Sequence, residues 1–231
     1  MKSNILTALL ALVFGFVGAA LWSVSGLGNQ QTRDYLLANP QILPDMAQAW
    51  EKAQAAERLA DAGDALQSPF RGAVLGNPNG SRTLVKFTDY GCGYCRTSVP
   101  DIARLVAGDP DLKVVVREWP IFAGSEDAAR MGLAAAAQGK YDAYYHAMFE
   151  LGPPSPESVE AAAQVAGLDM ESARSFAASE EVTRELAQNM AYARQLGFTG
   201  TPSWVAGGTT FEGAVGFDRL AEALKQGDDE G

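Results

Sequence analysis

The cysteines of the chain, Cys92 and Cys95, lie three positions apart and directly follow the apolar run 83–90. The run predicts a buried strand, and Gly91 predicts a turn into a helix that begins at Cys92. Unpaired backbone N–H groups and the dipole at a helix start stabilise a thiolate there. Cys95, one turn further on, is within reach to close a small disulfide ring. Because a thiolate is the species that attacks disulfides, we predict that the pair is redox-active.

Other uses of the cysteine pair are weaker. A structural disulfide across so short a loop would constrain the unfolded chain little. A zinc site needs four ligands, and beyond the thiols the chain offers one histidine, His146, and carboxylates. We expect His146 to be a packed, hydrogen-bonded residue of a helix, and we predict no metal site. A Cu(I) site can use two thiolates alone, so a Cu(I)-binding protein is the alternative from another functional class.

The N-terminal segment, residues 1–28, predicts export. Lys2 precedes an uncharged, mostly apolar stretch from 5 to 27. The stretch is longer than the roughly 7–15-residue core of a signal peptide and reaches the ~20 residues that span a bilayer. We expect residues 5–27 to act as an uncleaved anchor, with cleavage after the small residues 18–20 as the alternative. An exported protein whose only cysteines form one such pair does not use them for its own stability.

The rest of the chain, about 200 residues, is long enough for one well-filled domain with an appended segment. Its composition is that of a globular protein, with 47% hydrophobic and 20% charged residues and a formal net charge of −10. This acidity argues against a nucleic-acid partner, for which a basic surface is expected.

Residues 29–67 predict a helical arm. A polar linker at 28–32 comes first, and Pro44 suits the first turn of a helix that ends near residue 62. The arm either packs on its own catalytic domain or drives self-association, and we expect homo-oligomerisation through residues 33–66. The apolar side chains that would otherwise face water are Tyr35, Leu36, Leu37, Ile42, Leu43, Met46 and Trp50.

Residues 68–227 predict an α/β domain, followed by an acidic tail at 228–231 that we expect to fray. A helix from Cys92 to about 107 should be kinked by Pro100. It connects two strands that should be parallel, as in a right-handed βαβ unit. The strands of this first half are expected at 71–75, 83–90 and 112–119.

The second half of the domain begins with a helical block at 125–196, an insertion of about 123–197. A strand then leads to Gly207 and Gly208, which predict a two-residue hairpin turn, and residues 209–213 return antiparallel. A final helix carries Phe217, Leu220, Ala221 and Leu224 along one face.

This order of elements resembles the thioredoxin fold with a helical insertion, as in the DsbA-like thiol–disulfide oxidoreductases of the bacterial cell envelope. The resemblance covers roughly residues 68–226 and is carried by Phe-Thr-Asp-Tyr-Gly-Cys-Gly-Tyr-Cys at 87–95, Arg-Glu-Trp-Pro-Ile at 117–121 and Gly-Thr-Pro-Ser at 200–203. It implies specific roles at the site. Cys92 would be the exposed nucleophile, Cys95 the resolving cysteine, Gly93 and Tyr94 the active-site loop, and Thr201 and Pro202 a cis-proline segment facing the disulfide.

The arm sequence at 36–43 is similar to the oligomerisation segment of the ScsC-like (copper-sensitivity-suppressor C) branch, some members of which are trimeric disulfide isomerases. This resemblance implies a periplasmic disulfide isomerase, which the expected anchor at residues 5–27 would hold at the inner membrane. It also implies cysteine-containing protein substrates, a membrane redox partner, and a trimer, or else a dimer, through residues 33–66. No cofactor is expected beyond the Cys92–Cys95 disulfide. A monomeric dithiol oxidase or reductase is the alternative if the arm folds back.

The sequence departs from the family pattern at two places. Gly93 and Tyr94 stand where the oxidant DsbA has Pro-His, and together with Thr201 they are similar to the isomerase DsbC. Without a histidine beside the Cys92 thiolate, we expect a weaker oxidant. Lys86 stands where thioredoxin-like proteins commonly carry a buried acid. Either its amine reaches out to solvent, or it points inward, favours a thiolate on Cys95 and has a lowered pKa.

Overall fold

The computed structural model describes residues 2–25 and 27–229. The chain forms two compact units, residues 1–52 and residues 53–231. The last ten residues of helix α3 (Ile42–Ala62) belong to the larger unit, as does the short 3₁₀ helix η1 (Asp64–Gln67) that follows.

The smaller unit consists of α1 (Lys2–Ser25), α2 (Leu27–Ala38) and the start of α3. Among the residues whose placement is described, no helix is both long and apolar enough to cross a membrane. The predicted anchor at 5–27 includes residue 26 and the side chains of 5–9, 23–25 and 27, which lie outside the described residues.

The predicted linker at 28–32 is wrong, because α2 runs through it. The segment contains no proline, and its two glutamines are good helix formers, so its glycine, asparagine and threonine weaken the helix without ending it. The helix ends instead just before Asn39 and Pro40, since the residue that precedes a proline is disfavoured in the helical region. Helix α3 then begins at Ile42, ahead of the expected Pro44.

The larger unit is built on a five-stranded sheet in the order β1-β3-β2-β4-β5. Strands β2 and β3 are parallel, which confirms the predicted βαβ unit, and the other neighbouring pairs are antiparallel. Glycines 207 and 208 join β4 to β5 as predicted. The strands are β1 (Val74–Gly76), β2 (Arg82–Thr88), β3 (Leu112–Glu118), β4 (Ser203–Ala206) and β5 (Thr209–Glu212).

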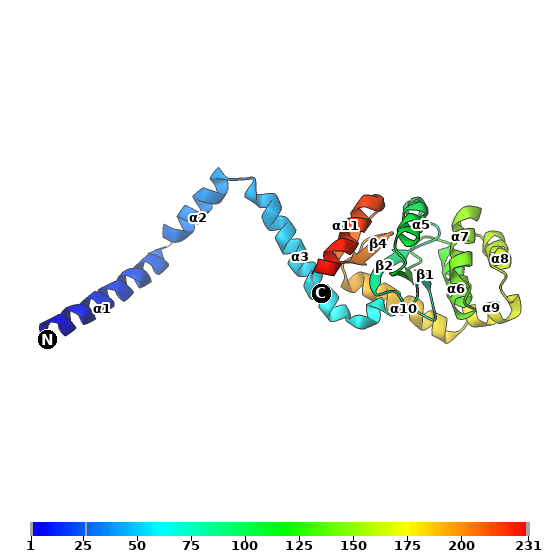
Figure 1. Ribbon diagram of the computed structural model, residues 1–231, viewed down its shortest axis with the longest axis horizontal. Helices are drawn as coiled ribbons and strands as arrows, with labels where there is room; N and C mark the ends of the chain where they lie inside the picture. The colour runs from blue at the N-terminus through cyan, green and yellow to red at the C-terminus, as the bar shows by residue number, and fades with distance from the viewer. Residues whose placement is uncertain (1, 26, 230–231) are drawn as a thin grey trace. The chain divides into compact units, whose positions relative to one another are not determined.

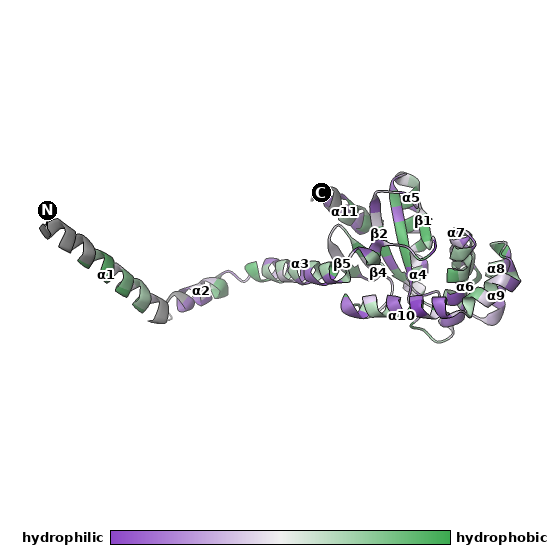
Figure 2. Ribbon diagram, turned by 90° about the horizontal axis from the view of Figure 1, so that it is seen from below, coloured by the Kyte–Doolittle hydropathy of each residue, from purple (hydrophilic) through white to green (hydrophobic). Residues whose placement is uncertain are grey.

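Both faces of the sheet are covered, because side chains alternate along each strand. Val85, Phe87 and Val115 pack with α10 and the end of α3. Leu84 and Val114 pack on the opposite face with α5, α7 and α11. The strands are therefore largely apolar on both sides, as the green of β1 in Figure 2 illustrates.

The predicted helix after Cys92 is two helices, α4 (Gly93–Thr97) and α5 (Val99–Gly108). Pro100 lies in the first turn of α5, where its missing N–H is not needed. The predicted kink at Pro100 is therefore wrong, because the helix is interrupted at Ser98, two residues before the proline.

The predicted helical block is confirmed as a run of helices. Figure 1 shows α6 to α9 gathered at one end of the larger unit, with α11 at the other. Helix α11 reaches Asp229 and so includes part of the predicted tail, whose residues 230 and 231 lie outside the described part of the chain. The helices are α6 (Ser125–Ala137), α7 (Tyr141–Leu151), α8 (Pro156–Val165), α9 (Met170–Ala177), α10 (Glu180–Gln195) and α11 (Gly216–Asp229).

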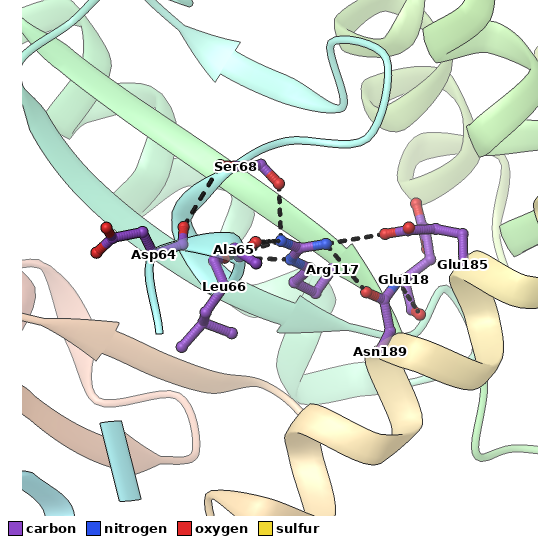
Figure 3. Close-up of polar contacts among 8 residues, drawn as sticks. All are labelled: Asp64, Ala65, Leu66, Ser68, Arg117, Glu118, Glu185 and Asn189. Carbon is purple, nitrogen blue, oxygen red and sulfur yellow. Dashed lines mark hydrogen bonds and ion pairs between the residues drawn. The ribbon is translucent and has the colours of Figure 1, made fainter. Parts of the chain in front are cut away.

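Arg117 on β3 fastens η1 to the sheet (Figure 3). Its guanidinium is buried and also contacts Glu185 at 2.9 Å and Asn189 at 3.3 Å on α10. Since five N–H donors in a fixed fork can serve several acceptors, one side chain joins three parts of the domain. Arg117 Nη2 donates to the carbonyl oxygens of Ala65, Leu66 and Ser68 at 2.6, 2.9 and 2.7 Å.

Candidate active site

Both cysteines lie at the start of α4, where β2 ends. Cys92 is the N-cap residue, and its Sγ accepts a hydrogen bond from the backbone N–H of Cys95 at 3.4 Å. The same Sγ lies 3.1 Å from the carbonyl oxygen of Thr201, which precedes Pro202 across a cis peptide bond. The structure therefore brings together Cys92, Cys95, Thr201 and Pro202, as the sequence predicts, and confirms the cis-proline.

The cysteines differ sharply in acidity. The pKa of Cys92 is lowered from 9.0 to about 5, chiefly because the Cys95 thiol donates to it and also because backbone N–H groups of α4 do so. The pKa of Cys95 is strongly raised, because burial disfavours its charged form and because its proton is held by Cys92. At neutral pH the pair thus consists of a Cys92 thiolate and a Cys95 thiol.

The prediction that Cys92 is exposed is wrong. Its exposed fraction is 3%, against 0% for Cys95, so acidity rather than exposure distinguishes the two. Tyr94 between them is 69% exposed, and a Cβ on Gly93 would meet no atom within 4 Å. The active-site loop therefore presents Tyr94 and open space to a substrate, with the thiolate just below.

Asp89, which sequence reasoning missed, holds the turn before Cys92. Its buried carboxylate accepts from the N–H of Gly91 at 2.7 Å. It also accepts from the N–H groups of Ile121 and Phe122 at 2.6 and 2.8 Å. The loop after β3, with Ile121 42% and Phe122 48% exposed, is thereby fixed beside the cysteine turn. An acidic residue inside an apolar run was the signal that could have identified it.

Lys86 points inward, so the expectation that its amine reaches solvent is wrong and the inward alternative holds. It is fully buried on β2, and Nζ donates to Tyr145 Oη at 2.6 Å and to Ser98 Oγ at 3.1 Å. Burial lowers the pKa of Lys86 from 10.5 to about 8, although the charges of Cys95, Glu118 and Cys92 oppose the shift. The long side chain of a lysine can bring its amine to solvent only from a strand near the edge of a sheet. Strand β2 lies in the middle of the sheet, so the amine of Lys86 stays buried.

Glu118 at the end of β3 is a second buried ionisable residue, and the sequence analysis did not identify it. Its Oε1 accepts from the hydroxyls of Tyr90 at 2.8 Å and Tyr141 at 2.7 Å. Burial raises the pKa of Glu118 from 4.5 to about 8. Its position, two residues after a β-branched run of the kind found in strands buried on both faces, was the available signal.

His146 takes no part in this site. It is hydrogen-bonded as predicted, with Nδ1 2.9 Å from the carbonyl oxygen of Asp142, but it is packed on one side only, because its ring lies against Tyr145 while 43% of its side chain is exposed. Within residues 2–25 and 27–229, no group of three or more histidine, cysteine or acidic side chains could hold a metal ion.

Two protein families match the chain. Residues 83–225 match the DSBA-like thioredoxin domain, and residues 30–57 match the N-terminal domain of the copper resistance protein ScsC. The first match covers the βαβ unit, the helical block and the hairpin, and the second covers α2 and part of α3.

Solved structures agree with this assignment. A thioredoxin-like oxidoreductase from Silicibacter pomeroyi is 40% identical with a TM-score of 0.68, over 72% of this chain and 98% of that one. A linker-deletion mutant of Proteus mirabilis ScsC is 25% identical with a TM-score of 0.71, over 88% of this chain and 94% of that one. A periplasmic thioredoxin-like protein from Salmonella enterica is 26% identical with a TM-score of 0.64, over 72% and 95% of the two chains.

Curated relatives are longer proteins. The Na⁺/H⁺ antiporter NhaA of Herminiimonas arsenicoxydans is 29% identical over 211 residues, which are 86% of this chain and 33% of that protein. This chain spans a third or less of the length of the curated relatives it matches. With more than half of its length matched to one family, the chain belongs to the DSBA-like thioredoxin domain family and carries an ScsC-type N-terminal segment.

Proposed function

We propose that this protein is a thiol–disulfide oxidoreductase that acts on protein disulfides through Cys92 and Cys95. The observation that carries the proposal is the geometry at the start of α4, where Cys92 Sγ accepts the N–H of Cys95 and lies 3.1 Å from the carbonyl oxygen of Thr201. This geometry displaces the two cysteine pKa values in opposite directions. A stable thiolate is ready to attack at neutral pH, and a thiol held beside it can resolve the product.

The reaction has two steps. The Cys92 thiolate attacks a substrate disulfide, a mixed disulfide forms, and one substrate sulfur leaves as a thiolate that takes a proton from water. Cys95 then loses its proton to solvent, and its Sγ attacks Sγ of Cys92, which breaks the mixed disulfide and releases the second substrate sulfur. The substrate is reduced by two electrons and the cysteine pair is oxidised by two; the reverse sequence oxidises a substrate dithiol.

An apolar rim beside the thiolate supports protein substrates. Tyr94 is largely exposed, and Ile121 and Phe122 are about half exposed on the loop that Asp89 fixes next to the turn. Unfolded chains present apolar side chains near their cysteines, and such residues would contact this rim. Thr201 and Pro202 face Cys92 from the other side and would line the bound segment.

We further propose that the protein is a disulfide isomerase that self-associates through residues 33–66, as a trimer in preference to a dimer. The ScsC N-terminal match over 30–57 supports this, as do the arm's exposed apolar side chains. Isomerisation requires holding a misfolded substrate between successive attacks, which several active sites around a shared surface would favour. The exposed side chains are Tyr35, Leu36, Leu37, Leu43, Met46 and Trp50, with exposed fractions of 60, 36, 67, 69, 50 and 65%, whereas Ile42 is half-buried.

The bacterial periplasm is the proposed location, with export directed by the N-terminal segment and a membrane redox partner that resets the cysteine pair. The apolar composition of residues 5–27 and the similarity to a periplasmic protein of Salmonella enterica support this location.

Trapping of covalent intermediates tests the proposed chemistry. Cys95→Ser should accumulate mixed disulfides with a scrambled, disulfide-containing protein, because the resolving thiol is gone. Cys92→Ser should neither form mixed disulfides nor turn over substrate. Mass spectrometry after acid quenching identifies the linked cysteine. Mixed disulfides on Cys95 rather than Cys92, or turnover by Cys92→Ser, would overturn the assignment.

A further inference from the structure

Lys86 and Glu118 lie behind the cysteines as neighbours in the sheet. Parallel pairing places Lys86 opposite Val116 and Thr88 opposite Glu118, so the two charged residues are offset by two positions on adjacent strands. Side chains alternate along a strand, so both point to the face that packs against α7. Both are fully buried.

Their polar partners are hydroxyl groups rather than each other's charges. Lys86 Nζ donates to Tyr145 Oη and Ser98 Oγ, while Glu118 Oε1 accepts from Tyr90 and Tyr141. The rings of these tyrosines pack together, with Tyr145 6.1 Å from Tyr141 and 6.2 Å from Tyr90 between ring centroids. We call Lys86, Tyr90, Glu118, Tyr141 and Tyr145 the buried charge cluster.

The cluster is joined to the resolving cysteine. Ser98 Oγ, which accepts from Lys86, donates to the carbonyl oxygen of Cys95 at 2.7 Å. Lys86 Nζ also lies over the rings of Tyr145, Phe149 and Trp204 at 5.2 to 5.5 Å from their centroids, which favours its ammonium form. A positive charge is therefore linked to Cys95 through the single hydroxyl of Ser98.

The hydrogen bonding of Glu118 differs from that of Lys86. Both of its hydroxyl donors serve Oε1, and Oε2 is buried without a hydrogen-bond partner among the described residues. An ionised carboxylate with one bare buried oxygen is far less stable than the neutral acid. Burial accordingly raises the pKa of Glu118 to about 8. Below that pH the cluster consists of an ammonium and a neutral acid, and its net charge is positive.

We propose that the buried charge cluster is a charge switch for the second step of the reaction. With Glu118 protonated, the uncompensated charge of Lys86 stabilises the Cys95 thiolate as it forms and so speeds its attack on the mixed disulfide. Ionisation of Glu118 or deprotonation of Lys86 removes that charge. Lys86 and Glu118 are positioning residues, since they act through the electrostatics of Cys95. This inference rests on the proposed function and assigns residues to one step of it.

Several titratable groups surround the switch and enter its pH dependence. Because these groups interact with Lys86, Glu118 and their tyrosine partners, the pH dependence of the resolution rate reflects the titration of the whole set rather than of Lys86 alone. The groups are Asp89 and Tyr90 in the turn, Cys92 and Cys95 on α4, and Tyr141, Asp142, Tyr144 and Tyr145 on α7, with Asp127 on α6 acting on Tyr144.

Step-resolved kinetics of matched variants test the proposal. Lys86→Met keeps the length of the side chain and removes its charge, whereas Glu118→Gln mimics the neutral acid. Each pKa unit by which Cys95 rises should slow resolution about three- to fourfold, because the tenfold loss of thiolate is partly offset by the greater nucleophilicity of the more basic thiolate. At pH 7 we therefore expect Lys86→Met to slow resolution about threefold or more and to leave the alkylation rate of Cys92 within about twofold of the wild type. Glu118→Gln should resolve mixed disulfides at close to the wild-type rate.

The pH profile provides a readout that a structural role would not produce. In the wild type the resolution rate should increase with pH, but less steeply above about pH 8, where the buried charge cluster loses its net positive charge. In Lys86→Met the increase should continue. Wild-type resolution by Lys86→Met, equal slowing in both variants, or an unchanged profile would overturn the proposal.

A further variant covers loss of folding. If Lys86→Met does not fold, the double variant Lys86→Met/Glu118→Gln leaves no ionisable group at either position and should fold, because no charge is then left buried without compensation. It should still resolve slowly, and wild-type resolution by this variant would refute the switch. Failure of the wild type to form mixed disulfides at all would instead refute the proposed function.

Discussion

The acidity of Cys92 sets a quantitative expectation for the redox potential. Its pKa of about 5 lies between those of the attacking cysteines of thioredoxin, about 7, and DsbA, about 3.5. The corresponding potentials are about −270 mV and −120 mV, and linear interpolation gives about −180 mV for this protein. Such a pair is a weaker oxidant than DsbA by about 60 mV, or about 2.8 kcal/mol in a two-electron couple.

Tyr94→His tests the electrostatic cause of that value. A histidine cation about 5 Å from the thiolate would stabilise it by about 1 kcal/mol at water-like dielectric, and the 69% exposure of Tyr94 favours this low end of the range. Since about 1.4 kcal/mol corresponds to 30 mV, the potential should rise by about 20 mV. Tyr94→Phe keeps the ring without a charge and should leave the potential unchanged.

Equilibration against glutathione redox buffers measures both quantities. Between the pKa values of the two cysteines the potential should fall by about 30 mV per pH unit, because the reduced pair then binds one proton. Below about pH 5 the slope should double, because the Cys92 thiolate is protonated as well. A wild-type potential at or above that of DsbA, or a potential lowered by Tyr94→His, would refute the reasoning.

Three further predictions concern the scaffold. Gly91→Ala should destabilise the fold by about 1–3 kcal/mol in urea unfolding, because its Cβ would lie 2.6 Å from Ser125 Oγ. The control Gly93→Ala should have little effect, because its Cβ would meet no atom within 4 Å, and equal losses of stability in the two variants would contradict this packing. Arg117→Met should lower the free energy of unfolding by about 3–5 kcal/mol and increase hydrogen exchange at residues 64–68, because Glu185 loses its partner and three carbonyl groups lose their donor. Unchanged protection of residues 64–68 would contradict this role of Arg117. By light scattering, a chain that starts at Asn29 should be oligomeric and a chain that starts at Ala53 should be monomeric. The shorter chain should lose isomerase activity but still reduce small disulfides. If the longer chain is monomeric, a simple oxidase or reductase becomes the better interpretation.

The sequence predicts the parts of the site that are local. Cys92 and Cys95 owe their placement to a strand, a turn and a helix start within about a dozen residues. Thr201 and Pro202 could be placed only through the family resemblance, because nothing local indicates that a segment more than 100 residues away faces Cys92.

The buried charges could not be predicted in the same way. The direction of Lys86 depends on Tyr145 and Ser98, which lie on other elements, and the role of Glu118 depends on hydroxyls from the turn and from α7. A charged residue in a strand gives no sign of whether such partners exist. Arg117 is a similar case, since its partners lie 49 to 72 positions away.

Titration of the Cys92 thiolate tests the central claim most directly. Thiolate absorbance in the ultraviolet, or the pH dependence of alkylation of the reduced protein, gives its pKa. We predict a transition near pH 5 that is absent in Cys92→Ser and present, at a higher pH, in Cys95→Ala, which removes the thiol that donates to Cys92. A Cys92 that titrates near the ordinary value of 9.0, or a low transition that survives in Cys92→Ser, would contradict it.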